Sequence, residues 1–124
     1  MGTYLIYGGA GAIGSAIARR LAEAGHSVHL AGRDAGKLQA LVAELGCTFT
    51  AGDVLEAGVI DKVTADAGSS LDGLVFAVGS INLKPLARLT EADFVADFNL
   101  NALSAVKAIQ AALPASPTRG SWPD

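Results

Sequence analysis

A glycine-rich segment near the N-terminus carries the clearest chemical signal in this sequence of 124 residues. Residues 9–14 read G-x-G-x-x-G, follow a short apolar run and open a segment with helical spacing. Glycines so placed permit a tight turn and let the backbone approach a pyrophosphate, while the helix N-terminus offers unpaired N–H groups. Because 15 glycines can produce this spacing by chance, the prediction depends on the strand–turn–helix context. We expect the pyrophosphate of a dinucleotide to bind here; the alternative is a structural turn without a ligand.

The residues after the second apolar run indicate which dinucleotide is bound. NAD sites usually carry an Asp or Glu about 20 residues after the glycine turn, where it holds the ribose 2′-hydroxyl. This sequence has Ala31, Gly32 and Arg33 at that point. A guanidinium cannot accept a hydrogen bond from a hydroxyl, but its planar fork suits a 2′-phosphate. Arg33 therefore favours NADP over NAD and disfavours FAD or methyl-donor sites. The alternatives are a solvated Arg33 and an Asp34 that binds the ribose or caps the next helix.

Hydrophobic periodicity predicts alternating strands and helices along the chain. Strands are expected at residues 3–8, 27–32, 47–51 and 71–78, and helices at 12–24, 35–45, 55–67 and 90–113. The last helix is a candidate for a break near Asn99, and Asp53 is the expected N-cap of the third helix. This order predicts βαβ units with right-handed crossovers. The expected fold class is therefore α/β: an incomplete Rossmann-type parallel sheet flanked by helices, with about four strands in the order 3-2-1-4.

Two of these helices carry apolar faces that are expected to be buried. The face of the first helix consists of Ile13, Ala16, Ile17 and Leu21. The last helix carries an apolar stripe made of Phe94, Phe98, Leu103, Val106 and Ile109. Packing on the sheet is the simplest expectation for this stripe.

The glycine turn and the residues around Arg33 resemble motifs of the short-chain dehydrogenase/reductase family. Residues 7–14 are similar to the family's T-G-x-x-x-G-x-G turn, with Tyr7 in place of Thr and Ala12 in place of the middle Gly. Residues 31–34 read A-G-R-D and are similar to the NADP-dependent members. The resemblance runs from about residue 3 to residue 113.

Three later segments extend the resemblance. Asp53 and Val54 look like the family's adenine-contacting Asp–hydrophobic pair after the third strand. Residues 76–79 stand where the family has N-N-A-G, and only Gly79 matches. Residues 98–100 resemble the family's V-N-L, whose Asn takes part in a proton relay.

The resemblance implies a set of site residues. Those expected to bind the cofactor, NADP with NAD less favoured, are Gly8, Gly9, Gly11, Ala12, Ile13, Gly14, Arg33, Asp53, Val54, Ala77 and Gly79. Asn99 is the one catalytic residue that carries over; the alternative is a helix-interior Asn that bonds locally. No metal site is expected, because His26 and His29 lack nearby Cys or carboxylate partners.

The remaining catalytic residues of the family have no counterpart in this sequence. The family's Ser and its Tyr-x-x-x-Lys supply carbonyl binding, acid/base chemistry and a lowered Tyr pKa. Here the two tyrosines are Tyr4 and Tyr7, and Gly8 and Gly11 stand four residues after them. Whether this chain is an enzyme is therefore open. We expect the NADP-binding N-terminal portion of an NADP-dependent oxidoreductase acting on a carbonyl or alcohol substrate, inactive as this chain. The alternative is a non-catalytic NADP-binding sensor or interaction module.

The composition sets the expected domains. Residues 1–113 are expected to form one NAD(P)-binding domain, and residues 114–124, with three prolines and no periodicity, a disordered tail. The abrupt change in composition after Leu113 suggests truncation or a shifted reading frame. Without a fifth strand, the apolar fourth strand would be an open sheet edge.

The expected partners and location follow from charge, hydropathy and the resemblance. A formal net charge of −3 gives no electrostatic reason to expect nucleic acid or an anionic membrane as partner. No apolar run reaches the roughly 18 residues of a membrane span, and a single cysteine, Cys47, suits a reducing cytoplasm. The expected partners are the dinucleotide and, in a complete parent protein, a small-molecule substrate. The family also implies a homo-oligomer formed through the helix around residues 90–113.

Overall fold

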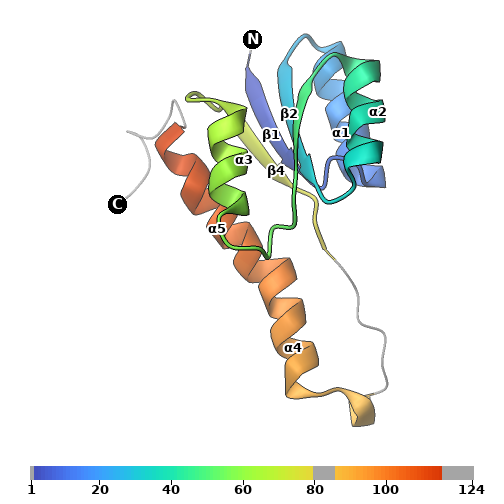
Figure 1. Ribbon diagram of the computed structural model, residues 1–124, viewed down its shortest axis with the longest axis vertical. Helices are drawn as coiled ribbons and strands as arrows, with labels where there is room; N and C mark the ends of the chain where they lie inside the picture. Colours follow the sequence, from blue (N-terminus) through green and yellow to red (C-terminus); the bar gives the residue numbers. More distant parts are fainter. Residues whose placement is uncertain (1, 80–85, 116–124) are drawn as a thin grey trace.

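Four parallel strands organise the fold in a computed structural model that describes residues 2–79 and 86–115. The strands are β1 (Thr3–Tyr7), β2 (Ser27–Gly32), β3 (Thr48–Ala51) and β4 (Gly73–Phe76). They lie in the order β3-β2-β1-β4, and every neighbouring pair is parallel. The structure confirms the predicted α/β class and the predicted strand order 3-2-1-4 (Figure 1).

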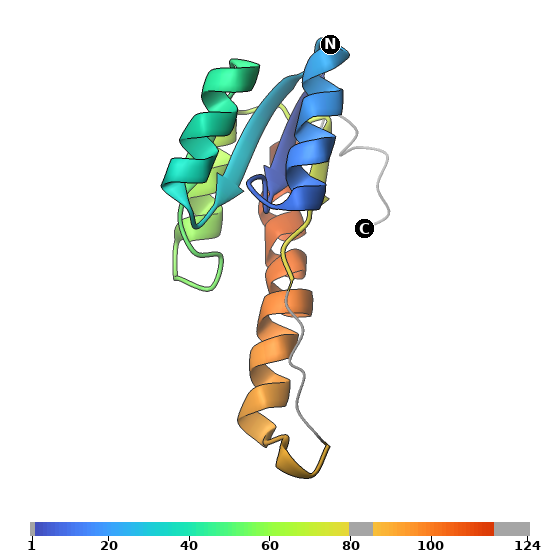
Figure 2. The same ribbon diagram turned by 90° about the vertical axis from the view of Figure 1, so that its right-hand side faces the viewer.

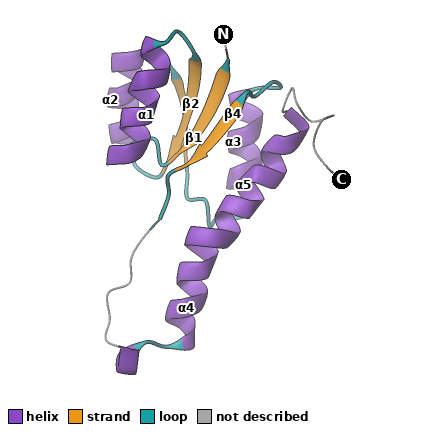
Figure 3. Ribbon diagram, turned by 180° about the vertical axis from the view of Figure 1, so that it is seen from behind, coloured by secondary structure: helices purple, strands orange, loops and turns teal. Residues whose placement is uncertain are grey.

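Helices cover both faces of this sheet. On one face lie α1 (Ala12–Glu23) and α2 (Ala35–Leu45), and on the other lie α3 (Val59–Ala67) and α5 (Ser104–Ala112). Figure 3 shows the two helical layers on opposite sides of the strands. The chain is thus doubly wound, as alternating strands and helices require when each crossover is right-handed.

The central strands β1 and β2 are buried on both faces. Leu5 and Tyr7 face α3 and α5, whereas Ile6 faces α1 and α2 together with Leu30. All four side chains are fully buried. Continuous apolar runs in the sequence are therefore the correct signature of these strands, because a parallel strand covered on both faces has no solvent-facing side to alternate with.

Helix α1 confirms half of the predicted apolar face: Ile17 and Leu21 pack against the core, whereas Ile13 and Ala16 do not. Ile13, expected to be buried, is 71% exposed, and Ala16 is also exposed. The buried residues are Gly14 and Ala18, with Ile17 packed beside them. The face is displaced because Gly14 contacts the turn after β1, and this contact fixes the rotation of the helix.

Helix α3 begins later than predicted, and the expected N-cap role of Asp53 is wrong. The Asp53 side chain accepts from the backbone N–H of Leu55, and its carbonyl accepts from Glu56, so Asp53 organises a turn. The N-cap of α3 is Gly58, in the left-handed region with φ of 83°. Asp is suited to either role because its carboxylate can bond to the backbone two or three residues on.

Strand β4 is shorter than the predicted strand at residues 71–78. The N–H of Leu71 donates to Ala115 and the N–H of Asp72 to Thr3, so these two residues precede the ladder. Within the described residues, β4 pairs only with β1 and its side chains are half-buried. Of the predicted tail, Pro114 and Ala115 belong to a short helical turn, and the remainder lies outside the described residues.

The long C-terminal helix is interrupted where the sequence suggested. Helix α4 (Glu91–Phe98) continues through a π-helical segment, Asn99–Leu103, into α5. Thr90 and Asp93 form a reciprocal capping box that starts α4. Figure 2 shows α4 extending away from the sheet, while α5 packs against α3 and β4. In the described ranges, no helix has the length and apolarity needed to cross a membrane.

The apolar stripe of the long helix is exposed, so the prediction that it packs on the sheet is wrong. Phe94, Phe98, Val106 and Ile109 are 48–59% exposed, and only Leu103 is half-buried. The residues of α5 that do face the core are small, namely Ser104, Ala108 and Ala112. Small side chains let α5 lie close to α3, which turns the larger apolar residues outward.

We expect Leu30→Ala to lower the free energy of unfolding by about 2–5 kcal/mol, because it removes a fully buried side chain between the sheet and helices α1 and α2. Urea unfolding of the whole chain measures this change. Leu55→Ala is the matched control, since Leu55 is exposed and its loss is expected to change stability by less than about 0.5 kcal/mol. Equal effects of the two substitutions would contradict the assigned core.

Candidate functional site

The glycine turn joins the carboxyl ends of β1 and β2. The N–H groups of Gly8 and Gly9 both donate to the carbonyl of Ala31, at 2.9 and 3.2 Å. Gly11 closes the turn by donating to the carbonyl of Gly8 at 3.0 Å. Gly8 has φ of 76°, a conformation that glycine adopts without strain. The predicted turn residues are therefore held in one compact loop above the sheet.

Close backbone contacts explain why glycines occupy this loop. A Cβ on Gly8 would lie 2.6 Å from the carbonyl oxygen of Ala77. A Cβ on Gly14 would overlap the carbonyl oxygen of Gly8, and one on Gly9 would lie 2.9 Å from the Leu30 side chain. The first turn of α1 can thus approach β1 closely only because these side chains are absent.

The N-terminus of α1 is left available for an anion. Its N-cap is Gly11, which has no side chain to bond the first-turn N–H groups, and that turn has no acidic residue. Ala12 and Ile13 are exposed at this end. Unpaired N–H groups and the positive end of the helix dipole together make a site for a pyrophosphate.

Arg33 and Asp34 have different roles at the end of β2. The Arg33 side chain is 80% exposed, and its Nη1 lies 3.9 Å from Oδ2 of Asp53. Asp34 is the N-cap of α2, and its Oδ1 accepts from the N–H of Lys37 at 3.1 Å. The capping alternative for Asp34 therefore describes the structure. The Arg33 cation therefore projects from the end of β2 toward solvent, in a long ion pair with Asp53.

The end of β3 brings Asp53 and Val54 to the same edge of the sheet. The N–H of Gly52 donates to the carbonyl of Gly32 at 2.8 Å, which ties this connection to β2. Asp53 keeps one carboxylate oxygen on its own turn and directs the other toward Arg33. Val54 is half-buried and packs against the core beneath α3.

The connection after β4 meets the π-helical segment. The N–H of Ala77 donates to the carbonyl of Tyr7 at 2.9 Å, which places Ala77 beside the glycine turn. A Cβ on Gly79 would lie 2.9 Å from Oδ1 of Asn101. Asn101 was not predicted as a site residue, although its position two residues after Asn99 could have suggested it.

Asn99 begins the π-helical segment at the junction of α4 and α5. Its carbonyl accepts from both the N–H and the hydroxyl of Ser104, the latter at 2.7 Å. π-Helical turns often occur at functional sites, because they redirect side chains within a helix. The structure thus places Asn99 at a distinctive backbone feature, while its proton-relay role stays a prediction.

These residues gather at the carboxyl ends of the parallel strands, where open α/β sheets bind ligands. The turn at residues 8–14, Arg33, Asp53 and Ala77 follow β1, β2, β3 and β4 in that order. The arrangement offers donors and a positive charge to a dinucleotide. Within the described part of the chain, no cluster of His, Cys, Asp and Glu could hold a metal ion.

Neither tyrosine is placed to act as an acid at this edge. Tyr7 is fully buried under α3 and α5, and this burial raises the pKa of its hydroxyl. Tyr4 lies toward the opposite end of β1, where its ring contacts His26 edge-on at 5.0 Å. The described residues therefore form a binding edge rather than a complete acid/base site.

Comparison with known proteins agrees with this geometry. A family model described as short chain dehydrogenase matches residues 3–121. Oxidoreductase asL5 of Sarocladium schorii is 36% identical over 118 residues, which cover 90% of this chain and 47% of that protein. A solved dehydrogenase/reductase from Sinorhizobium meliloti is 32% identical with a TM-score of 0.81, covering 90% of this chain and 48% of that one. A short-chain type dehydrogenase/reductase from Mycobacterium ulcerans is 25% identical with a TM-score of 0.84, covering 91% and 46%.

The chain belongs to the short-chain dehydrogenase family, whose members are oxidoreductases that use an NAD(P) dinucleotide. It spans about half the length of the relatives that it matches. The family match includes the glycine turn, the ends of β2 and β3, and the π-helical segment.

We expect Gly14→Ala to lower the free energy of unfolding by about 1–3 kcal/mol and to abolish dinucleotide binding, because its methyl group would displace α1 from Gly8. Urea unfolding and calorimetric titration with NADPH measure the two effects. Gly36→Ala in α2 is the control: the added Cβ makes only an ordinary contact at 3.4 Å, and Ala is the better helix former. A Gly14→Ala chain as stable as the wild type would contradict the assigned contact.

Proposed function

We propose that this chain is an NADP-binding portion of a short-chain dehydrogenase/reductase that transfers hydride between NADP and a carbonyl or alcohol substrate. The observation that carries the preference for NADP is the projection of Arg33 from the end of β2, while Asp34 is engaged as the N-cap of α2. A guanidinium pairs with a 2′-phosphate, and the carboxylate of Asp34 is engaged by the N–H of Lys37 rather than directed to a 2′-hydroxyl.

The proposed cofactor position follows the carboxyl edge of the sheet. The pyrophosphate lies against the glycine turn and the N-terminus of α1, and the adenine lies near Asp53 and Val54. The proposed contact residues are Gly8, Gly9, Gly11, Ala12, Ile13, Gly14, Arg33, Asp53, Val54, Ala77 and Gly79. Their common location at one edge supports this assignment, since each follows a strand end or belongs to the first turn of α1.

The proposed catalytic contribution of this chain is limited to Asn99. The sequence holds no Tyr-x-x-x-Lys, and the buried Tyr7 cannot reach a ligand at the carboxyl edge. We therefore propose that the chain binds NADP without completing the reaction. The second candidate function, a non-catalytic NADP-binding sensor or interaction module in the cytoplasm, is favoured by the same missing residues.

We expect calorimetry on the full 124-residue chain to show NADPH binding clearly tighter than NADH binding. Arg33→Ala should weaken NADPH binding by about 10- to 100-fold, the value of one or two charge-assisted contacts, and leave NADH binding unchanged. The effect should shrink at higher salt, because Arg33 is exposed.

Arg20→Ala is the matched control for this experiment, since it removes one exposed arginine from the last turn of α1, away from the site. Equal losses in both variants would indicate a general charge effect. Tighter binding of NADH than of NADPH would contradict the role given to Arg33.

We also propose that the chain forms a homo-oligomer through the exposed residues of α4 and α5. The apolar surface consists of Phe94, Val95, Phe98, Val106 and Ile109, each about half exposed. Large apolar side chains grouped on one projecting helix are typical of a protein–protein interface. The contact of α5 with α3 and β4 uses its other side, so the residues that the structure describes leave this surface exposed to a second copy.

Phe98→Glu should shift the protein toward the monomer, because it places a charge in the centre of the proposed interface. Sedimentation velocity over a range of protein concentrations measures the oligomeric state. Leu55→Glu is the control, since Leu55 is similarly exposed but lies before α3. A wild-type chain that stays monomeric at high concentration would contradict this proposal.

A further inference from the structure

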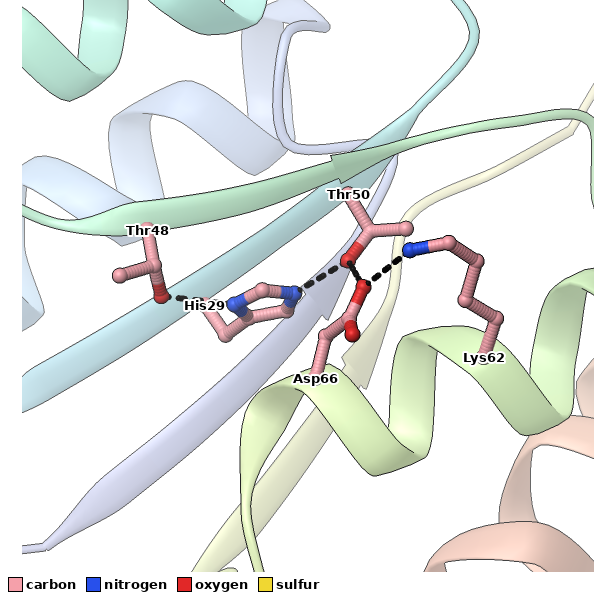
Figure 4. Close-up of polar contacts among 5 residues, drawn as sticks. All are labelled: His29, Thr48, Thr50, Lys62 and Asp66. Carbon is pink, nitrogen blue, oxygen red and sulfur yellow. Dashed lines mark hydrogen bonds and ion pairs between the residues drawn. The ribbon is translucent and has the colours of Figure 1, made fainter.

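His29 is a buried polar side chain that the nucleotide site does not use. It lies on β2 facing α3 and is 3% exposed. Its Nδ1 lies 2.7 Å from the hydroxyl of Thr48, and its Nε2 lies 2.7 Å from the hydroxyl of Thr50 (Figure 4). Both threonines are on β3, so the imidazole bridges the two strands on one face of the sheet.

The hydrogen bonds continue from β3 to α3. The Thr50 hydroxyl donates to Oδ2 of Asp66 at 2.7 Å, and Nζ of Lys62 donates to the same oxygen at 2.7 Å. Lys62 and Asp66 are one helical turn apart. We call the five residues Thr48, His29, Thr50, Asp66 and Lys62 the histidine relay. It connects β2, β3 and α3 through side chains alone.

The hydrogen bonds of the relay fix which ring nitrogen of His29 carries a proton. The carboxylate of Asp66 only accepts, because the ammonium of Lys62 and the hydroxyl of Thr50 hold its pKa below the ordinary value. Thr50 has a single hydroxyl hydrogen and donates it to Asp66, so it must accept from Nε2–H of His29. In the neutral ring Nδ1 then accepts from Thr48. When the ring is neutral, His29 is thus the Nε2–H tautomer.

A second proton on His29 places a positive charge in a buried site. The exposed Thr48 can accept from Nδ1–H by turning its own hydrogen toward solvent, so the cost of protonation is the burial of the charge and not a lost hydrogen bond. The charged groups facing the ring are Asp66, which favours the proton, and Lys62, which opposes it, both from α3. Strand β3 offers only hydroxyls, and the neighbour on β1 is Leu5. Burial is the largest influence, and it lowers the pKa of His29.

We propose that the histidine relay is an acid-sensitive latch, which holds β3 and α3 against β2 when His29 is neutral and releases them when it is protonated. Strand β3 is suited to release, because its four residues pair only with β2 in the described sheet. A buried cation is costly, so the protonated ring is accommodated best when this edge opens to water.

Protonation of His29 favours the open chain, because burial lowers the pKa of the ring in the folded chain. The folded chain binds a proton at His29 less readily than the open chain, in which the pKa has its ordinary value of about 6.5. The latch is therefore fully closed above about pH 6.5 and weakens as the pH falls below it. Asp66 stays ionised across this range, because its pKa lies below the ordinary carboxyl value of 3.8.

The latch has a consequence for the site. The segment between Thr50 and α3 carries Asp53 and Val54, so its release would remove the proposed adenine contacts. This link rests on the proposed function, whereas the latch itself does not. The latch is therefore tested on the chain without cofactor.

The first test is an NMR titration of the full chain between about pH 7.5 and pH 5, combined with amide hydrogen exchange. We expect the ¹⁵N shifts of His29 to report the Nε2–H tautomer at the upper pH. Protection of the amides in β3 and α3, corrected for the intrinsic pH effect, should fall by about tenfold for each pH unit by which the His29 midpoint lies below 6.5. An Nδ1–H tautomer, or protection that falls equally throughout the sheet, would overturn the latch.

The second test compares His29→Gln with His26→Gln, which removes the other histidine of the chain. Glutamine keeps a donor toward Thr50 but does not titrate, so β3 and α3 should lose their pH response in His29→Gln and retain it in His26→Gln. If His29→Gln fails to fold, His29→Asn, whose amide likewise does not titrate, should also abolish the response. A pH response that persists in either folded His29 variant would overturn the proposal. Failure of NADPH to bind would affect only the proposed function.

Discussion

The contact between Gly14 and Gly8 is the constraint on which most of this structure depends. It brings the first turn of α1 against the carboxyl end of β1 and sets the rotation of the helix. That rotation buries Gly14 and Ala18 and exposes Ile13. It also aims the uncapped N–H groups of α1 over the edge where the strands end. The packing of α1 and the placement of its N-terminus thus have one geometric origin, and a Cβ at either glycine would meet backbone atoms.

The parallel sheet turns separate sequence segments into one site. Because all four strands run in the same direction, the residues that follow them meet at one edge regardless of their distance in the chain. Arg33 and Asp53 are brought together in this way. Below this edge, the same two strands are joined by the buried His29 and its threonines. The site and the relay therefore share β2 and β3.

Much of this arrangement could be predicted, and the errors have identifiable causes. The four strands, their order and the interruption near Asn99 follow from local patterns of apolarity and from the short connections between elements. The first helical face is predicted correctly only at Ile17 and Leu21, because apolarity alone cannot show that Gly14 must contact Gly8. The N-cap role predicted for Asp53 is wrong because an Asp suits both a helix cap and a turn, and the sequence does not distinguish the two. The exposed stripe of α4 and α5 was expected to be buried because a sequence does not say which side of a helix meets the core.

The sequence by itself determined the features that depend on neighbouring residues. These are the glycine turn, the cation after the second strand and the alternation that specifies a parallel sheet, since each is encoded within a few positions. The tertiary structure decided what depends on residues far apart. His29 became a bridge with a defined donor, Nε2–H, only because β3 and α3 placed Thr50 and Asp66 beside it. The same assembly made Asp34 a helix cap and left the Arg33 cation exposed beside Asp53. Hydrogen-bond partners are set by packing in three dimensions, and spacing along the chain does not record them.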